Sequence, residues 1–345
     1  MSRSDGPLSR ALRWEAARSH HHGEFDEERL ARPGRASVSV CVPAREEAAT
    51  IGPIVEALVG LRERGVVDEV VVVDADSRDG TAAIAVRAGA TVHRQSALVP
   101  HLGPVLGKGD AMWRALVVLR GEVICYLDAD SEDFGAHFAR GLIGPLLGDP
   151  SVGFVKGSYR RPFKAGEVRL PSGGGRVNEL AARPLLGRFY PELSAVRQPL
   201  AGELAARREL LERLPFSTGY GVEIGLLIDA YREVGLAGLA QVDLGVRQNR
   251  HQPLSELGPM AYAVLGAVTR RLDAEGRLHD RPPGAFLAAE GEALEVRDVT
   301  LAERPPFSSL AAGGATSRRW ARAAGSPRGA GPPPPAPTPS ALRGS

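Results

Sequence analysis

The fold is decided by residues 37–81, which read SVSVCVPAREEAATIGPIVEALVGLRERGVVDEVVVVDADSRDGT. An apolar, β-branched strand pattern (SVSVCV) is followed by a helical pattern over 50–64, a second strand pattern over 68–74 and, from Gly80, the start of another helix. A further strand pattern, GEVICYLD, stands at 121–128. Strands that alternate with helices in this way predict an α/β fold, with a mostly parallel sheet covered by helices on both faces.

The rest of the chain differs from this pattern in three places. Residues 1–36 are predicted to form an N-terminal arm, and we assign no chemistry to its triplet His20–His22, because neighbouring histidines in a polar terminus are usually solvated. Residues 151–304 continue the domain begun by 37–150, with less regular elements. Residues 305–345 are rich in Pro, Gly, Ala, Ser and Arg and are predicted to be a disordered tail.

The composition of the 345 residues is typical of a soluble globular protein, with 43% hydrophobic and 24% charged residues. No run of 18 apolar residues occurs, so we expect a cytoplasmic protein that does not enter a membrane. The net charge is +2, but residues 305–345 carry five arginines and no acidic residue, which leaves no basic excess elsewhere for binding nucleic acid. Cys41 and Cys125 lie in apolar strands, where free cysteine acts as a small hydrophobe.

The strongest chemical signal is Asp128-Ala129-Asp130, at the end of the strand pattern 121–128. Two carboxylates two residues apart can face Mg²⁺ or Mn²⁺ together with the oxygens of a diphosphate. Strands also end in solvated aspartates for no functional reason, so this motif alone is weak.

Three other polar loops follow predicted elements of the same sheet: Pro43–Glu47, Asp74–Thr81 and Gly107-Lys108-Gly109. The glycines around Lys108 let the backbone approach a ligand, and the lysine supplies a point charge for phosphate. Ordinary turn chemistry explains each loop separately. Together they predict a nucleotide site at the edge where open α/β sheets bind ligands.

These motifs resemble a known group of enzymes. PAREEAATIG, VVDADSRDGT, GKGDAMWRAL and YLDAD are similar to glycosyltransferases with the GT-A fold. The strings VKGSYRRPF, GGGRVNELAARPLL, PFSTGYGVEIGLLID and AQVDLGVRQNRHQPLSELG resemble the actinobacterial glucosyl-3-phosphoglycerate synthases and their mannosyl relatives, over about residues 37 to 270. The resemblance implies that 37–150 is the nucleotide-sugar-binding half of a GT-A domain and 151–304 the acceptor-binding half with C-terminal helices.

The activity implied by this resemblance is a retaining transfer of glucose or mannose from a UDP- or GDP-sugar to the 2-hydroxyl of 3-phosphoglycerate. The product would be a precursor of glucosylglycerate- or mannosylglycerate-type solutes or polysaccharides. The resemblance also implies a homodimer that uses Mg²⁺ or Mn²⁺.

The resemblance assigns site residues in four groups: catalytic, metal-binding, donor-binding and acceptor-binding. Glu223, Asp130 and Lys108 would be catalytic, and the metal would be held by Asp130 and His251. The donor would be bound by Pro43, Ala44, Arg45, Glu46, Glu47, Ala75, Lys108, Asp128, Ala129, Tyr220, Glu223, Arg247 and Arg250. The acceptor would be bound by Gly175, Arg176, Val177, Asn178 and Asn249.

Four of these positions depart from the pattern of the family. Ala75 is often Ser in relatives and Asn178 is often Thr. Asn249 and His251 stand in exchanged places, because relatives commonly have His before Asn in this stretch. We expect His251 to be the metal ligand, since residues two apart in an extended chain share a face.

Two alternatives remain open at this point. An inverting GT-A transferase acting on a lipid phosphate or polysaccharide would share the first four loops. A catalytically inactive sugar-nucleotide-binding protein would keep the binding loops and work through its tail.

Overall fold

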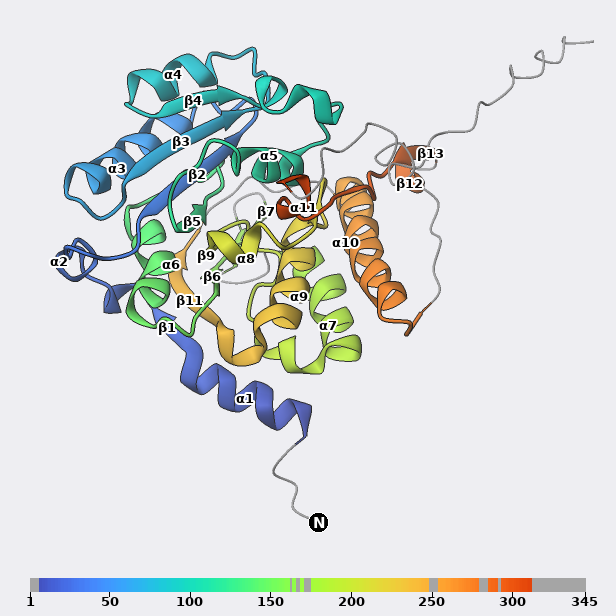
Figure 1. Ribbon diagram of the computed structural model, residues 1–345. Coiled ribbons are helices and arrows are strands. Elements are labelled where there is room, and N and C mark those ends of the chain that lie inside the picture. Colours follow the sequence, from blue (N-terminus) through green and yellow to red (C-terminus); the bar gives the residue numbers. More distant parts are fainter. Residues whose placement is uncertain are drawn as a thin grey trace, which may run out of the picture.

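The computed structural model describes residues 6–161, 163–165, 168–170, 175–247, 254–278, 285–290 and 293–311. Its centre is an eight-stranded sheet in the order β1-β11-β6-β9-β5-β2-β3-β4, which runs in Figure 1 from β4 at the top to β1 near the bottom. The strands are β1 (Ser19–His21), β2 (Val38–Ala44), β3 (Glu69–Asp74), β4 (Thr91–Arg94), β5 (Val123–Tyr126), β6 (Phe154–Arg160), β9 (Leu204–Arg207) and β11 (Leu239–Val246).

The sheet is parallel except at β9, which pairs antiparallel with both β5 and β6. Every other pairing between neighbouring strands is parallel. The predicted α/β class with a mostly parallel sheet is therefore confirmed.

The remaining elements surround this sheet. The helices are α1 (Pro7–Arg18), α2 (Glu27–Leu30), α3 (Ile51–Glu63), α4 (Thr81–Arg87), α5 (Lys108–Ala115), α6 (His137–Gly148), α7 (Arg183–Phe189), α8 (Arg208–Leu211), α9 (Val222–Val234), α10 (Leu254–Ala274) and α11 (Ser308–Ala311), together with the π-helix η4 (Asn178–Ala182) and the 3₁₀ helices η1 (His22–Glu24), η2 (Gln95–Ala97), η3 (Pro100–Leu102), η5 (Pro191–Ala195) and η6 (Leu236–Gly238). The short strand pairs are β7 (Phe163–Ala165) with β8 (Val168–Leu170), β10 (Phe216–Ser217) with β14 (Glu303–Arg304), and β12 (Ala285–Glu290) with β13 (Ala293–Asp298).

Two hydrophobic cores lie on the two faces of the sheet, because successive side chains of a strand point to opposite faces. In β3, Val70 and Val72 belong to one core and Val71 and Val73 to the other. Helices α3 and α6 cover the first core, whereas α5 and α9 cover the second. The valine run of β3 is apolar throughout because both of its faces are buried.

The N-terminal segment, predicted as an arm, contributes to the sheet itself. β1 pairs with β11, with Ser19 opposite Gln241. Helix α1 is held by Trp14, whose Nε1 donates to the Leu239 carbonyl at 2.8 Å. The sheet therefore joins strands from residues 1–36 with strands from both predicted halves.

The C-terminal segment was predicted to be disordered from residue 305, and this boundary is too early. Trp113 Nε1 donates to the Pro305 carbonyl at 2.9 Å, and the rings of Trp113 and Phe307 lie 5.3 Å apart. Residues 305–311 thus pack on α5, while 312–345 lie outside the described residues.

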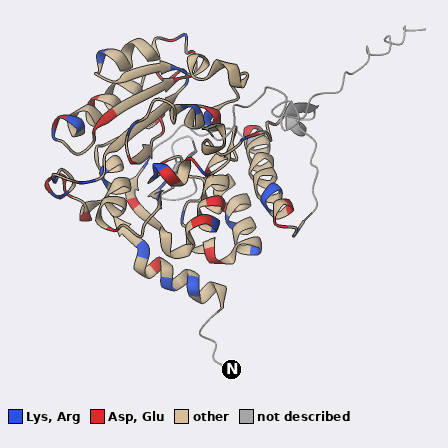
Figure 2. Ribbon diagram, viewed as in Figure 1, with Lys and Arg blue, Asp and Glu red and all other residues tan. Residues whose placement is uncertain are grey.

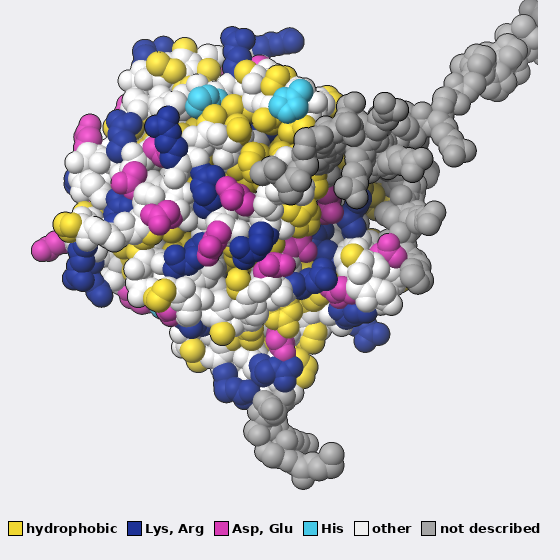
Figure 3. Space-filling model, in the orientation of Figure 1, with side chains coloured by type: hydrophobic (Ala, Val, Ile, Leu, Met, Phe, Trp, Pro, Cys, Tyr) yellow, Lys and Arg dark blue, Asp and Glu magenta, His cyan; other side chains and the backbone are white. Residues whose placement is uncertain are grey.

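Charged residues lie mainly on the surrounding helices and loops (Figure 2). On the face shown in Figure 3, basic and acidic side chains are interspersed, with no broad area of one sign. Among the described helices, none combines the length and the apolar character needed to cross a bilayer. Cys41 and Cys125 are free and buried, and burial raises the pKa of both thiols.

Candidate active site

The loops that follow β2 and β3 are joined by hydrogen bonds at the carboxyl edge of the sheet. The Glu46 amide donates to Ser77 Oγ and the Arg78 amide donates back to Glu46 Oε1, both at 2.9 Å. The Glu47 amide donates to Thr81 Oγ1 at 2.8 Å. Glu46 itself has a left-handed backbone with φ 56°, which a residue with a side chain rarely adopts without such support.

The loop Asp128-Ala129-Asp130, also predicted to bind the nucleotide, lies at the same edge of the sheet. Thr50, the residue before α3, donates its hydroxyl to the Ala129 carbonyl at 2.6 Å. The Ala75 amide donates to the Ala44 carbonyl at 2.8 Å. Because parallel strands end at the same edge, three of the loops that the sequence predicted to meet do contact one another.

Lys108 is the first residue of α5, and two glycines set its position. Gly107 has φ 111°, which favours glycine, and a Cβ on Gly109 would lie 1.8 Å from the Ser217 carbonyl oxygen. Only glycine at 109 lets α5 approach the chain before α9 this closely. The helix start therefore carries Lys108 toward the carboxylates of two other elements.

The Lys108 ammonium lies between two carboxylates. Its Nζ contacts Asp128 Oδ1 at 2.5 Å and Glu223 Oε1 at 2.9 Å. Burial alone would lower the pKa of Lys108, but these two carboxylates raise it well above its usual range. Burial would likewise raise the pKa of Asp128, yet Lys108 and Arg247 hold it well below the usual range. Lys108 and Asp128 are therefore both charged at neutral pH.

Arg247 forms ion pairs with three carboxylates, those of Asp128, Asp130 and Glu203. Its NH1 donates to Asp128 Oδ2 at 3.0 Å and to Glu203 Oε1, and its NH2 donates to Asp130 Oδ1 at 2.6 Å. NH1 also lies 3.0 Å from the Tyr159 hydroxyl, with the guanidinium 5.3 Å from the centre of that ring. This arginine follows β11, its carboxylate partners follow β5 or precede β9, and Tyr159 lies in β6, so the whole fold assembles the cluster.

A buried polar layer beneath this cluster was not predicted from the sequence. It consists of Lys156, Tyr159 and Glu203, with Arg161 beside them. Lys156 Nζ donates to the Ala201 carbonyl, and burial lowers its pKa to about 8. Arg161 NH2 donates to the Tyr159 hydroxyl at 2.7 Å. A charged residue inside an apolar strand, as in GFVKGSY, is the sequence signal that indicates such a layer, because burying an ion is costly without a purpose.

The turn predicted to bind the acceptor lies next to this layer. Gly175 has φ 76°, and a Cβ placed on it would be 3.8 Å from Arg161 Cδ. Arg176 and Val177 are half-buried and lead into η4. Asn178, the buried first residue of η4, accepts the Leu200 amide at 3.4 Å and donates to the Arg197 carbonyl at 3.5 Å.

Residues 197–203 connect the acceptor turn to the donor loops. One end of this segment contacts Asn178, as described above. At the other end, a Cβ on Gly202 would lie 2.2 Å from Asp128 Oδ1, so the backbone packs directly on that carboxylate. The two predicted subsites are thus adjacent and share one stretch of chain.

The other predicted donor residues differ in exposure. Pro43 and Ala44 end β2, and Ala44 is buried, whereas Arg45 and Glu46 are exposed. Tyr220 is 56% exposed at the turn that begins α9. The remaining predicted residues, Asn249, Arg250 and His251, lie outside the described residues, so their roles stay predictions.

The residues of this site fit a metal ion shared with a ligand. No group of three or more His, Cys, Asp or Glu within the described ranges can hold a metal by itself. Mg²⁺ in nucleotide enzymes is usually bound by one or two carboxylates and completed by phosphate oxygens and water. The half-exposed carboxylate of Asp130, next to Asp128, offers that kind of partial ligand set.

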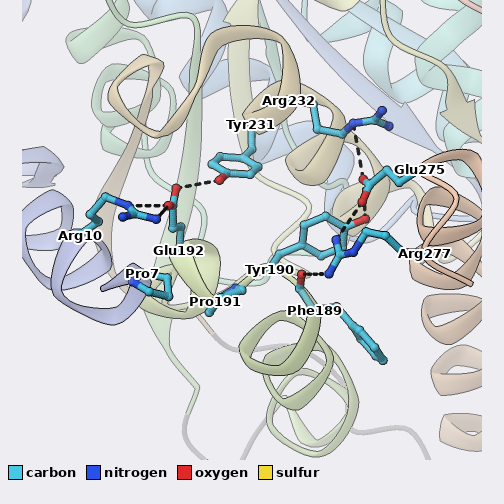
Figure 4. Close-up of a pocket in the computed structure, with 10 residues that line it drawn as sticks. All are labelled: Pro7, Arg10, Phe189, Tyr190, Pro191, Glu192, Tyr231, Arg232, Glu275 and Arg277. Carbon is cyan, nitrogen blue, oxygen red and sulfur yellow. Dashed lines mark hydrogen bonds and ion pairs between the residues drawn. The ribbon is translucent and has the colours of Figure 1, made fainter. Parts of the chain in front are cut away.

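A separate hollow of about 350 Å³ lies where α1, η5 and the C-terminal ends of α9 and α10 meet (Figure 4). Its charged side chains are paired across it: Arg10 with Glu192, and Arg232 and Arg277 with Glu275. Arg232 lies at the opposite end of α9 from Glu223, so this hollow is not part of the cluster around Lys108.

Comparison with known proteins agrees with this geometry. Residues 39–193 match Glycosyl transferase family 2. A glucosyl-3-phosphoglycerate synthase of Mycolicibacterium smegmatis is 44% identical over 283 residues, which cover 81% of this chain and 91% of that protein.

Two crystal structures are similar in fold and sequence. Mannosyl-3-phosphoglycerate synthase of Rubrobacter xylanophilus has a TM-score of 0.80 and 47% identity, covering 87% of this chain and 98% of that one. Glucosyl-3-phosphoglycerate synthase of Mycobacterium tuberculosis, in complex with Mn²⁺, UDP-glucose and phosphoglyceric acid, has a TM-score of 0.76 and 39% identity, covering 85% and 98%. The sequence identity extends over most of both chains, and the GT-A architecture is shared. From these findings and the charge cluster at the sheet edge, we conclude that the chain belongs to the glucosyl-3-phosphoglycerate synthase family of glycosyltransferases.

Proposed function

We propose that the protein transfers glucose or mannose from a UDP- or GDP-sugar to the 2-hydroxyl of 3-phosphoglycerate, with retention at the anomeric carbon. The observation that carries this proposal is the cluster in which Lys108 lies between Asp128 and Glu223, directly beside the segment that leads to Asn178. Such an arrangement brings a phosphate-binding cation and sugar-binding carboxylates next to a turn suited to a small anion. The family membership supports the same donor and acceptor classes.

In the proposed reaction, the bond between the anomeric carbon and the donor's phosphate oxygen breaks on the same face at which the acceptor oxygen bonds. The acceptor's proton passes to the departing diphosphate. Lys108 and Arg247 stabilise the negative charge on that diphosphate, and Glu223 orients the sugar through its hydroxyls. Mg²⁺ or Mn²⁺ at Asp130, and at His251 as expected from the sequence, supplies further positive charge for the leaving group when bound.

The acceptor is held by the turn Gly175–Asn178 and by Asn249 in this proposal. Backbone amides of the turn and the guanidinium of Arg176 suit the carboxylate and phosphate of 3-phosphoglycerate. We propose in addition a homodimer located in the cytoplasm, which the family resemblance and the composition support. Light scattering on the purified protein tests the dimer directly.

The experiment that tests the function incubates the purified protein with Mg²⁺ or Mn²⁺, 3-phosphoglycerate and, in separate reactions, UDP-glucose, GDP-glucose, UDP-mannose and GDP-mannose. We expect nucleotide release that depends on 3-phosphoglycerate, and a product whose anomeric configuration by NMR equals that of the donor. The variant Asp130→Ala is expected to fold normally and to lose transfer. Inversion of configuration, or nucleotide release at the same rate without the acceptor, would overturn the proposal.

A further inference from the structure

Glu203 is a carboxylate that the proposed reaction does not use, although it lies under the site. It precedes β9, and β9 runs antiparallel to β5 with Leu204 opposite Tyr126, so Glu203 lies at the edge where β5 ends. The residue is 1% exposed. One carboxylate oxygen accepts from Arg247, and the other is buried with no hydrogen-bond partner in the described part of the chain.

The three carboxylates around Arg247 differ sharply in exposure. The side chain of Glu203 is 2% exposed, that of Asp128 18% and that of Asp130 48%, whereas the side chain of Arg247 is fully buried. Asp130 is therefore the carboxylate that can turn toward a ligand arriving from solvent. Glu203 is the one that cannot leave the guanidinium.

A divalent cation and Arg247 compete for Asp130, because Arg247 NH2 already donates to Asp130 Oδ1 at 2.6 Å. A buried guanidinium that loses its counter-charges is strongly unfavourable. Arg247 can give up Asp130 without this penalty only if other carboxylates still face it. Asp128 is shared with Lys108, so Glu203 is the counter-charge that faces Arg247 without also facing Lys108 through a described ion pair.

We propose that Glu203 is a positioning residue: it is the fixed counter-charge of Arg247 and so lets Asp130 exchange between Arg247 and a divalent cation. This inference rests on the proposed function only in that Asp130 binds the metal. Its consequence is that Glu203 sets the affinity for the metal without touching the metal, the donor or the acceptor.

Glu203→Gln tests the proposal because it keeps the shape of the side chain and removes its charge. Arg247 should then hold Asp130 more tightly, and the Kd for Mn²⁺ at saturating UDP should rise about tenfold. The measurement is electron paramagnetic resonance of free Mn²⁺, which does not require turnover. The KM for 3-phosphoglycerate should change less than twofold, because Glu203 does not contact the turn Gly175–Asn178.

The matched control is Asp229→Asn. Asp229 is a buried carboxylate that faces the buried Arg271 at 2.5 Å, between α9 and α10. This variant also removes a counter-charge from a buried arginine, so its Tm should fall about as much as the Tm of Glu203→Gln does. Its Kd for Mn²⁺ should stay within twofold of the native value. A loss of Mn²⁺ binding in both variants would mean that general destabilisation is the cause, and the proposal would be wrong.

A double-mutant cycle with Arg247→Met separates action through Arg247 from a direct charge effect on the metal. In the Arg247→Met background, Glu203→Gln should have no further effect on the Kd for Mn²⁺. The same tenfold change in both backgrounds would show a direct electrostatic effect and overturn the proposal. The double variant removes both buried charges together, which is the better tolerated change, so it serves if Glu203→Gln alone does not fold.

If Glu203→Gln alone does not fold, the double variant should bind Mn²⁺ without nucleotide more tightly than the native protein, because Arg247 no longer competes for Asp130. Unchanged or weaker binding would contradict the proposal. Turnover of the native protein with sugar donors and 3-phosphoglycerate is measured separately. Failure of that assay counts against the proposed function, whereas failure of the Mn²⁺ cycle in an active protein counts against the role of Glu203.

Discussion

Lys156 is a charged residue near the site that the fold keeps buried, although burial disfavours its charged form. Its ammonium is buried in β6 and donates to the Ala201 carbonyl, and the pKa is lowered to about 8 by burial. The nearby Glu223 and Glu203 oppose that shift. A methionine would fill the same space without a charge, so the lysine is retained at a cost in stability.

The stability cost at Lys156 should depend on pH. Between about pH 8 and 10.5 the unfolded chain binds this proton and the folded chain does not, so the free energy of unfolding rises with pH because of this residue. Lys156→Met removes the effect. We expect the stability of the variant relative to the native protein to fall by about 2 kcal/mol from pH 7 to pH 10.

Urea unfolding at several pH values checks this prediction. Val155→Ala, on the same buried strand, serves as the control, and its difference from the native protein should not change with pH. A pH-independent difference for Lys156→Met as well would show that the lysine is not buried in its charged form.

Arg176 carries the sharpest prediction about the acceptor. A guanidinium can bind a carboxylate or phosphate through two parallel hydrogen bonds, and lysine cannot copy this geometry. Arg176→Lys should therefore raise the KM for 3-phosphoglycerate at least tenfold, a loss on the order of 1.5 to 3 kcal/mol, and leave the Kd for the sugar nucleotide nearly unchanged.

Steady-state kinetics and calorimetry distinguish the two sites. The exposed Arg188 on α7 provides the same substitution as a control, for which both constants should remain native. Weaker binding of the nucleotide sugar by Arg176→Lys, with the acceptor constant unaltered, would move this residue to the donor site.

At the scale of elements, the parallel part of the fold was predictable and β9 was not. The patterns over 50–64 and 68–74 correspond closely to α3 and β3, because long apolar periodic stretches specify their own structure. The stretch GELAARRELLERL consists mostly of strong helix formers, yet residues 204–207 form a strand. The two neighbouring strands supply its hydrogen bonds, and a local pattern contains no trace of them.

The same distinction explains which site residues were found. Asp128 and Asp130 stand at the end of a predicted strand and Lys108 stands in a loop predicted at the same edge, so their meeting point followed from the parallel sheet. Glu203 was missed because it precedes an antiparallel strand that was not expected. Three residues form β1, too few for any pattern, which is why the N-terminal segment was taken for an arm.

Helix α5 offers a test of how one element positions the site. Gly109→Ala would place a Cβ 1.8 Å from the Ser217 carbonyl oxygen, so α5 must move away from the chain before α9. Since Lys108 is the neighbouring residue, its contact with Glu223 should be lost. We expect a stability loss of about 1 to 3 kcal/mol, the usual range for overpacked cores, and a fall in kcat of at least tenfold.

Gly187→Ala is the matched control, because no atom lies within 4 Å of a Cβ at this position in α7. Alanine favours helix over glycine, so this variant should be more stable by about 0.5 to 1 kcal/mol and fully active. Thermal unfolding measures the stability of both variants, and steady-state kinetics measures their kcat. A fully active, stable Gly109→Ala protein would mean that α5 does not depend on this close approach.

For the whole molecule, the end of the folded part lies later than composition suggested. The chain packs on α5 through Phe307, and the Ser308 amide donates to the Glu212 carbonyl at 2.8 Å. The apolar residue Phe307 stands in the middle of a proline-containing stretch, so its partner Trp113 could not be identified without the fold.

Two truncations test this boundary. Deleting 312–345 should leave turnover and Tm unchanged, because that composition cannot form a packed part of the site. Deleting 305–345 removes Phe307 from Trp113 and should lower stability by about 2 to 4 kcal/mol. A large loss of activity in the shorter deletion, with normal unfolding, would show that the terminal residues reach the site.

The antiparallel strand β9 is also needed for the site to assemble during folding. Without residues 204–207, the sheet separates into β4-β3-β2-β5 and β6-β11-β1, with Asp128 in one part and Arg247 in the other. The pairing of Val123 with Arg207 joins distant parts of the chain, and such non-local pairings form slowly. The reaction centre therefore requires β9 to pair with both β5 and β6, and a chain in which this strand is not inserted has two half-sites and no complete site.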